Sequence, residues 1–466
     1  MFNVKIIVNN SIISREYDKP ILISEILNDV GIHQPKPCGG KGTCKKCEVL
    51  LNSKKVLSCQ TFVNCDSLIE LSDIKAIEGI TGGITREFDI DPLLAEGYGA
   101  AIDIGTTTIA GYIYKFPECK LIKSQCISNP QSEYGADVIT RIEYFKKGGK
   151  ENLYQAVIKA INELTEGFKI DKYIVCANTT MLYLLTQTDP YELAVAPYHA
   201  SELFGKWFDN YYLMPCNSAY VGSDVMAAAL ASDMYNDKIS LLVDIGTNGE
   251  MMLKCNDRIY CCSTAAGPCF EGAGISCGSQ ATNGAINKVY IEDGKLCFST
   301  IGNIEPTGIC GTGLVDAIAA LLELGIIEDS GYMEDNYYFE NSKIYISPDD
   351  IRMFQLAKAA ICSGIETLIN HAKINSSDIE TLYIAGGFGS FLNSKNAELT
   401  GIIPHEFSDK IKVIGNGAGI GASMVLRSKK CMEEVNSLAS NAESISLSDN
   451  PYFMEKYIDN MMFEVK

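Results

Sequence analysis

The sequence predicts two parts, a small β-rich N-terminal domain and a larger α/β domain made of two similar lobes. In residues 1–78, short runs alternate apolar and polar side chains, as paired β-strands do. After residue 100, apolar strands alternate with amphipathic helices, which is typical of α/β folds. One strand–turn–strand unit occurs twice in this second part, as AAIDIGTTTIAGYIY and SLLVDIGTNGEMMLK, and this repeat indicates two related lobes.

Length and composition indicate a soluble globular protein of two or three domains. The chain has 466 residues, of which 47% are hydrophobic and 21% charged, and its net charge of −19 argues against a nucleic-acid partner. No basic segment followed by an apolar run opens the chain, and no apolar stretch reaches about 18 residues, so we expect neither a signal peptide nor a membrane partner. Eighteen cysteines without a secretion signal indicate a reducing cytoplasm and suit an anaerobe.

The order of elements in residues 1–78 can be read from the local pattern. FNVKIIVN and SIISREY alternate like paired strands, and ISEILNDVGI has helical spacing. CEVLLNSKKVLSCQ predicts a hairpin that turns around Asn52–Lys55, and SLIELS predicts a last strand. Residues 79–99 carry five glycines and little periodicity, so we expect a linker there.

Four cysteines carry the chemistry of this domain: Cys38, Cys44, Cys47 and Cys59, set in PCGGKGTCKKCEVLLNSKKVLSC. Their C-x5-C-x2-C spacing with a distal fourth cysteine resembles the plant-type 2Fe–2S pattern, lengthened by one residue in the first gap. The neighbouring glycines permit the positive φ and close approach that wrapping a cluster requires. With the order of strands, this predicts a β-grasp ferredoxin domain that holds a 2Fe–2S cluster.

The larger domain divides at its repeated unit. We expect a first lobe over residues 100–240 and a second lobe over 241–426, with residues 427–466 packing on them as a strand (ESISLS) and a short helix (NPYFMEKYIDNMM). NLYQAVIKAINELTEGF predicts an amphipathic helix and KYIVCANTTMLYLL a buried strand that runs into a turn. AKAAICSGIETLINHA predicts a further helix.

Each DIGT turn places a carboxylate at the end of a buried strand, before a glycine and polar residues. Such turns can hold phosphate oxygens with backbone N–H groups and hydroxyls, while the aspartates Asp103 and Asp244 hold Mg²⁺ or its waters. A glycine turn after a later strand, IAGGFGSF, permits close approach by an adenosine. The residues expected to bind ATP are Gly105, Thr106, Thr107, Thr108, Gly246, Thr247, Asn248, Gly249, Gly386, Gly387 and Phe388.

These three elements, in this order, resemble the actin-like ATPase superfamily of sugar kinases, actin and chaperone ATPases. The DIGT turns match its two phosphate motifs, AGGFG its adenosine motif, and VGSDVMAAALAS and GNGAGIGASMVL its two connecting helices. The resemblance implies that Asp103, Asp224 and Asp244 converge on the metal and the attacking water. Asp244 or Asp224 is then the group that orients the water.

The fusion of both parts resembles the reductive activators of corrinoid proteins. Supporting stretches are NPQSEYGADVITRI, ANTTMLYLL, GPCFEGAGISCGS and GICGTGLVDAIAALLELGI. The resemblance implies an ATP-hydrolysing iron–sulfur electron-transfer protein that passes an electron from its cluster to the cob(II)alamin form of a corrinoid protein. This restores cob(I)alamin for methyl transfer and needs an external electron donor. A homodimer stays open.

Other readings of these residues remain. The cysteine quartet can bind zinc, although only Cys44 and Cys47 have the spacing of a zinc knuckle. A 2-hydroxyacyl-CoA dehydratase activator would place a 4Fe–4S cluster between subunits, with Cys269, Cys277 and Cys310 as candidate ligands. A small-molecule kinase would use an aspartate to deprotonate a substrate hydroxyl. A redox-sensing scaffold would need no ATPase activity, which the three aspartates disfavour.

Overall fold

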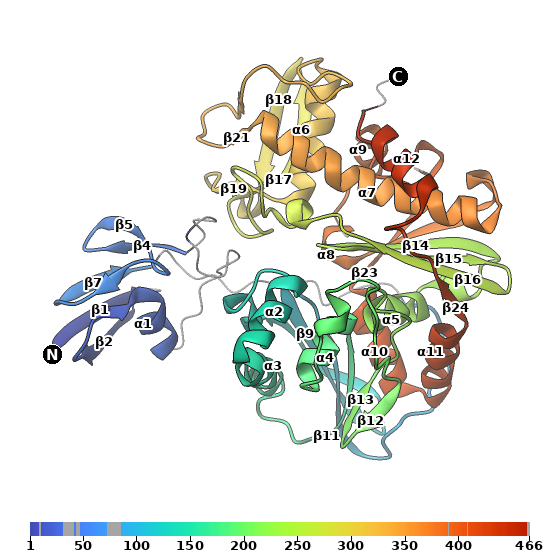
Figure 1. Cartoon of the computed structure of the whole chain (residues 1–466), viewed down its shortest axis with the longest axis horizontal. Coiled ribbons are helices and arrows are strands. Elements are labelled where there is room, and N and C mark those ends of the chain that lie inside the picture. Colours follow the sequence, from blue (N-terminus) through green and yellow to red (C-terminus); the bar gives the residue numbers. More distant parts are fainter. Residues whose placement is uncertain are drawn as a thin grey trace.

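The computed structural model describes residues 1–8, 11–30, 42, 47–71, 85–389, 391–407 and 409–463. Figure 1 shows a small N-terminal unit, drawn in blue, and a larger unit in which two sheets lie one above the other. The predicted cluster ligands Cys38 and Cys44 lie outside the described residues, as does the first part of the predicted linker.

The N-terminal unit is a five-stranded sheet with one helix. Strand order is β2-β1-β7-β4-β5, and β1 and β7 run parallel although they lie far apart in the sequence. Its elements are β1 (Phe2–Val8), β2 (Ser11–Tyr17), β3 (Ile21–Leu22), α1 (Ile23–Asp29), β4 (Glu48–Leu51), β5 (Lys54–Leu57), β6 (Phe62–Val63) and β7 (Ser67–Glu70). The predicted strand pair, helix, hairpin and last strand are confirmed.

Local chemistry explains both the hairpin and the core of this unit. Asn52 and Ser53 have φ of 47° and 64°, as a two-residue turn between twisted antiparallel strands requires. Val4 and Ile6 alternate along β1 and point to the same face of the sheet, where Ile23 and Ile26 of α1 bury their side chains completely.

The first lobe is built on a six-stranded sheet in the order β10-β9-β8-β11-β13-β12. Its strands are β8 (Gly97–Ile104), β9 (Thr108–Phe116), β10 (Lys120–Ser128), β11 (Ile170–Ala177), β12 (Lys206–Phe208) and β13 (Tyr211–Leu213). Helices α2 (Val138–Tyr144), α3 (Lys150–Leu164) and α4 (Thr179–Leu185) accompany it. The predicted amphipathic helix is α3, which buries Leu153, Val157 and Ile161 against one face of this sheet.

The second lobe has a sheet of the same size in the order β23-β22-β14-β15-β16-β24. Its strands are β14 (Ile239–Ile245), β15 (Gly249–Cys255), β16 (Arg258–Thr264), β22 (Thr381–Ala385), β23 (Ile411–Gly415) and β24 (Ala442–Ser444). The long helix α7 (Pro348–Ala372) covers one face, and a capping box between Ser347 and Asp350 begins it. The repeat predicted from the sequence is confirmed, because β14 and β15 pair as β8 and β9 do.

Smaller elements extend the second lobe away from the first (Figure 1). They are β17 (Ala285–Glu292), β18 (Lys295–Thr300), β19 (Gly308–Ile309), α6 (Gly311–Glu323), β20 (Tyr337–Tyr338), β21 (Tyr345–Ile346) and α9 (Ser394–Leu399). The short helix α8 (Gly386–Gly389) instead lies beside β14 and β23. Strands β17, β18 and β19 form a sheet of their own, and α6 packs on β17.

Two helices fill the space between the two large sheets. They are α5 (Ser223–Ala231) and α10 (Gly417–Arg427), the predicted connecting helices. Their apolar side chains share one core with Ala101 and Tyr112 of the first sheet and with Leu242 and Met252 of the second. Helix α10 therefore joins the lobes physically, although its sequence follows the second lobe.

Two predictions about connecting segments need correction. Residues 85–99 are not a free linker, because Gly97–Ile104 forms β8 and the preceding segment lies on the lobes. The backbone of Asp91 donates to the carbonyl of Arg427 at 3.1 Å, and Arg86 forms an ion pair with Glu434. The C-terminal part contains α11 (Lys429–Asn441), which the sequence pattern did not predict, before β24 and the predicted helix α12 (Pro451–Asp459).

Among the helices in the described part of the chain, none combines the length and the apolar surface that crossing a bilayer requires.

The close approach of α5 and α10 gives a prediction about stability. A Cβ atom at Gly421 would lie 2.0 Å from the carbonyl oxygen of Ala227, so Gly421→Ala must push the helices apart. We expect it to destabilise the protein by about 1–3 kcal/mol, seen as a lower thermal midpoint. Ser440→Ala on the exposed face of α11 is the control and should leave the midpoint unchanged. Equal midpoints for both variants would contradict this packing.

Candidate functional site

The two DIGT turns lie where strands β8 and β14 end, and neighbouring segments hold the first turn from outside. Asn129 accounts for two of these contacts, since its side-chain amide donates to the carbonyl of Gly105 and its backbone N–H to the carbonyl of Thr107, both at 2.8 Å. The guanidinium of Arg141 donates to the carbonyl of Thr106 at 2.6 Å. The backbone of this turn is therefore held in one shape before any ligand binds.

The structure brings together the three predicted catalytic aspartates. Asp103 ends the first strand, Asp244 ends the matching strand of the second lobe, and Asp224 lies in the first turn of α5. Each is still partly exposed, so the three line an accessible wall. Asn416, which caps α10, donates to Asp103 at 3.0 Å, and its own oxygen accepts from the backbone of Gly419 at 2.8 Å.

Burial and neighbouring negative charges raise the pKa values of these carboxyl groups. Burial raises the pKa of Asp103 to about 7, and the charge of Asp224 contributes to the rise. Burial also raises the pKa of Asp244 to about 7, with contributions from Asp224, Asp103 and Glu271. The pKa of Asp224 rises to about 6 because of burial. Raised pKa values in several neighbouring acids mark a site that needs a cation to be fully ionised.

Two further acids belong to this cluster, and the sequence reading missed both. Glu250 follows the second turn on β15; burial first, and then the charges of Asp224 and Asp244, raise its pKa well above the usual range. Glu271 accepts hydrogen bonds from the hydroxyls of Thr107 and Thr247 at 2.7 and 3.0 Å. The spacing of Glu250 after DIGT was a signal for the first, whereas only the tertiary fold reveals the second.

The glycine residues predicted to bind ATP have different surroundings in the structure. Gly386 has φ of 86°, and a Cβ there would lie 2.6 Å from the carboxylate of Asp244, so this glycine lies directly against Asp244. A Cβ at Gly249 would lie 2.3 Å from Ile361 of α7, which makes this glycine a packing requirement. The ring of Phe388 lies 4.9 Å from that of Phe270. Adenosine binding by Gly387 and Phe388 stays a prediction.

The residues around the two turns fit a magnesium nucleotide. Mg²⁺ is usually bound by one or two carboxylates together with phosphate oxygens and water, which matches aspartates beside two phosphate turns. Within the described ranges, no three His, Cys, Asp or Glu side chains are arranged around one point as a protein-only metal cage would be. Phosphate and water would thus complete the coordination, as this ion prefers.

In the N-terminal unit the described half of the cysteine quartet fits a cluster. The sulfur atoms of Cys47 and Cys59 lie 3.2 Å apart, and both residues are buried. Two thiolates on one tetrahedral metal with bonds of about 2.3 Å would be about 3.8 Å apart, so a small outward movement of the two sulfur atoms would admit a metal between them. Gly42, in the same loop, has φ of 77° and lies against Gln60, beside Cys59.

The three cysteines considered for a 4Fe–4S cluster between subunits all lie in the second lobe. Cys269 and Cys310 are buried, and Cys269 lies within the core of the second lobe, where burial raises the pKa of its thiol to about 12. The carbonyl of Cys277 accepts from the backbone of Ile309 at 2.8 Å. A buried thiol of raised pKa, such as that of Cys269, is a poor metal ligand, so the structure favours the reading of Cys269 as a core cysteine.

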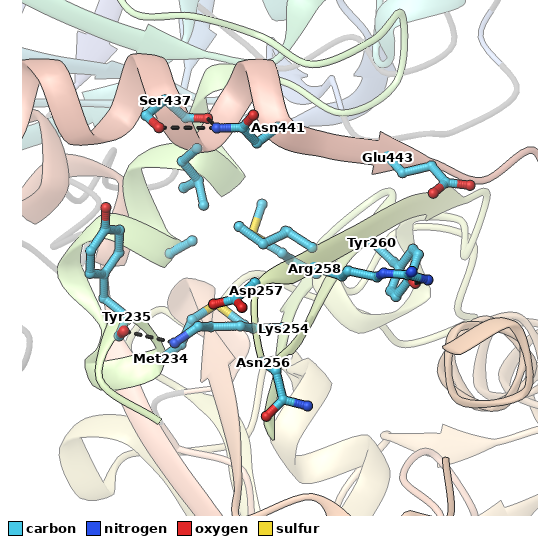
Figure 2. A pocket seen from close by; sticks show the side chains of 14 residues that line it. Met234, Tyr235, Lys254, Asn256, Asp257, Arg258, Tyr260, Ser437, Asn441 and Glu443 are labelled. Atoms are coloured by element: carbon cyan, nitrogen blue, oxygen red, sulfur yellow. Dashed lines mark hydrogen bonds between the residues drawn. The ribbon is translucent and has the colours of Figure 1, made fainter. Parts of the chain in front are cut away.

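A cavity of about 560 Å³ lies away from this site, between the β15–β16 hairpin, the segment after α5 and α11. Figure 2 shows its labelled side chains; Lys254 donates to the carbonyl of Tyr235 at 2.8 Å and the amide of Asn441 to that of Ser437 at 2.8 Å. None of the predicted site residues lines it. The cavity is thus separate from the two turns, and nucleotide binding at the turns stays a prediction.

The crowded carboxyls predict how stability varies with pH. Because their native pKa values lie above the unfolded value of 3.8, native stability falls as pH rises from about 4 to about 7. Asp224→Asn should therefore raise the thermal midpoint at pH 8 in EDTA, and raise it less at pH 5, where these groups are largely protonated. Asp257→Asn, in an exposed turn, should change neither value. A lower midpoint for Asp224→Asn at pH 8 would contradict the raised pKa of Asp224.

Comparison with known proteins shows which family the larger unit resembles. Residues 98–237 match the family model described as the RACo middle region, and residues 238–466 match the C-terminal domain of RACo, the ASKHA domain. A solved structure described as a reductive activator for corrinoid, iron-sulfur protein has a TM-score of 0.72 at 27% identity, covering 99% of this chain and 98% of that one.

Curated relatives extend the likeness over the sequence. The corrinoid activation enzyme RamQ of Eubacterium limosum is 30% identical, with 95% of this chain and 96% of that protein covered. The [Co(II) methylated amine-specific corrinoid protein] reductase of Methanosarcina barkeri is 27% identical, with 78% and 77% covered. From the two lobes, their paired phosphate turns and these matches, we conclude that the chain belongs to the RACo family of corrinoid activators.

Proposed function

We propose that this protein is an ATP-dependent reductive activator, which passes an electron from a 2Fe–2S cluster in its N-terminal unit to the cob(II)alamin of a corrinoid protein. The observation that carries the proposal is the meeting of Asp103, Asp224 and Asp244 at two phosphate turns in a chain of this family. The product would be cob(I)alamin, the state that accepts a methyl group. An external donor would reload the cluster.

ATP hydrolysis in this proposal relies on positioning and charge. The turns at Thr106 and Thr247 offer backbone N–H groups and hydroxyls to the phosphates, one turn from each lobe. Asp103 and Asp244 would hold Mg²⁺, which supplies charge neutralisation at the phosphates. Asp224, at the start of α5, would orient the water that attacks the terminal phosphorus, and its raised pKa lets it accept a proton from that water.

The positions of two cysteines support the iron–sulfur part of this proposal. Cys47 and Cys59, with sulfur atoms 3.2 Å apart, would bind one iron, and Cys38 and Cys44 would bind the other. When bound, the cluster supplies one-electron transfer. The reduction potential of such a cluster in plant-type proteins is about −400 mV. A one-electron step that is about 300 mV uphill costs roughly 7 kcal/mol. Reducing a cobalt centre of lower potential therefore needs coupling to ATP.

Coupling requires that ATP bind two arrangements of the complex with different affinity. The structure offers an element on which such a difference can act, because α5 and α10 lie between the two sheets and reach the site at their first turns. A change in the distance between the phosphate turns must move these helices. The surfaces of both lobes then move with them, and a bound corrinoid protein would sense that movement.

We expect the purified, anaerobic protein to reduce a corrinoid protein from cob(II)alamin to cob(I)alamin only with MgATP and a low-potential donor such as titanium(III) citrate. The spectrum of the corrinoid reports the reaction, and phosphate release reports hydrolysis. Asp103→Asn and Asp244→Asn should each lower both rates by about 100-fold or more. Asp257→Asn is the matched surface control. Hydrolysis that is unchanged in both site variants would contradict the two-lobe site.

The cluster gives a separate prediction. The reconstituted protein should hold two irons and two sulfides per chain, and Cys59→Ser should lower the iron content or shift the EPR spectrum, because one iron loses a thiolate. The exposed Cys65 is the control: Cys65→Ser should keep the cluster. A cluster that survives Cys59→Ser but not Cys65→Ser would contradict the ligand assignment, and zinc in place of iron would contradict the redox role.

A further inference from the structure

The side chain of Glu271 joins the two DIGT turns. One carboxylate oxygen accepts from the hydroxyl of Thr107 in the first lobe at 2.7 Å, and the other accepts from the hydroxyl of Thr247 in the second lobe at 3.0 Å. Hydrogen bonds to a charged acceptor are the stronger kind. A single side chain thus connects both lobes at the point where the terminal phosphate of ATP is expected.

The local sequence holds Glu271 in this place. It ends the 3₁₀ helix η5 (Pro268–Glu271), which lies between Gly267 and Gly272, with φ of 80° and 76°. The backbone of Gly267 donates to the carbonyl of Thr247 at 2.9 Å, which ties η5 to the second turn. Phe270 is buried and its ring lies 5.7 Å from that of Phe354, so the core anchors the residue before Glu271.

Positive charge from the first lobe supports this contact. Arg141 is completely buried and feels the negative charges of Asp137 and Glu271, which oppose the lowering of its pKa by burial. Its guanidinium donates to the carbonyl of Thr106. The next residue is Thr107, whose hydroxyl donates to Glu271. Glu271 therefore faces two hydroxyl donors and a guanidinium charge, a combination that equally suits a phosphate group.

We propose that Glu271 is an interlobe clasp that occupies the position of the terminal phosphate when no nucleotide is bound. The hydroxyls of Thr107 and Thr247 each have one proton to donate, so the carboxylate and the phosphate compete for them. ATP binding displaces Glu271 and replaces a protein contact between the lobes with a nucleotide contact. This inference rests on the proposed ATPase function and makes Glu271 the residue that sets nucleotide affinity and the resting distance between the turns.

The test compares nucleotide binding by the full-length protein and its variants, using calorimetry with the non-hydrolysable analogue AMPPNP and Mg²⁺. Glu271→Gln keeps the size of the side chain but loses its charge and one acceptor, so the Kd should fall about tenfold. Glu271→Asp keeps the charge but is one methylene shorter and cannot reach both hydroxyls, so its Kd should also fall. Glu305→Gln, exposed in the same lobe, is the control. An unchanged or higher Kd for Glu271→Gln would overturn the clasp.

The arrangement also predicts a readout that a purely structural role would not move. In nucleotide-free protein, Glu271→Gln should speed amide hydrogen exchange in peptides that cover both turns, 103–108 and 244–249, while with AMPPNP the two proteins should match. Slower exchange, or a difference that persists with nucleotide, would overturn the inference. A Kd that falls only in Glu271→Gln would do so as well, because repulsion by charge would then explain it. If the wild-type protein binds no nucleotide, the proposed function itself fails.

Discussion

The packing of α5 against α10 between the two sheets is the constraint on which the rest of the larger unit depends. Both helices carry small residues at their contact, and a Cβ at Gly417 would lie 3.0 Å from that of Ala228. Close approach lets two helices fit between two sheets with no further layer. It also brings the first turn of α5, with Asp224, and the cap of α10, with Asn416, to the ends of both DIGT strands.

The site formed in this way is costly to the protein without its ligand. Burial raises the pKa of the three aspartates and of Glu250, and the negative charge of Asp224 raises it further at Asp103, Asp244 and Glu250. Repulsion of this kind lowers the stability of the native state. A magnesium nucleotide would relieve it, so binding energy becomes available to change the arrangement of the lobes. We regard this stored repulsion as the physical basis of coupling in the proposed function.

The segment that begins at Thr85 lies on the lobes before β8 starts. From Thr85 onward the chain lies on the lobes, where the guanidinium of Arg86 donates to the carbonyl of Leu230 at 2.9 Å and pairs with Glu434 of α11. Leu230 belongs to the last turn of α5, the helix whose first turn holds Asp224. This segment thus contacts the lobes at a helix whose first turn carries Asp224.

Local patterns in the sequence were sufficient for the fold of each part. Alternation predicted the N-terminal hairpins, the repeated DIGT unit predicted two lobes, and the local pattern predicted α3, α7 and α10, because these signals depend only on nearby residues. The DIGT turns also pointed to Asp103 and Asp244, whereas α5 and Asp224 were expected from the family resemblance. The pattern missed α11, and it took residues 85–96 for a linker because their hydrogen-bond partners on the lobes lie 79 or more positions away.

The tertiary structure determines which residues of the two lobes come into contact at the DIGT turns. Glu271 lies in a stretch with no periodic signal, yet its carboxylate reaches hydroxyls 164 and 24 positions away, in two lobes. Arg141 lies in a helix that the sequence pattern alone does not connect with a phosphate turn, and Gly386 meets Asp244 only because β22 and β14 are neighbours. Sequence determined the elements and their ends through short-range sterics and apolar spacing. The contacts that join the lobes depend on packing between distant segments, which no local pattern encodes.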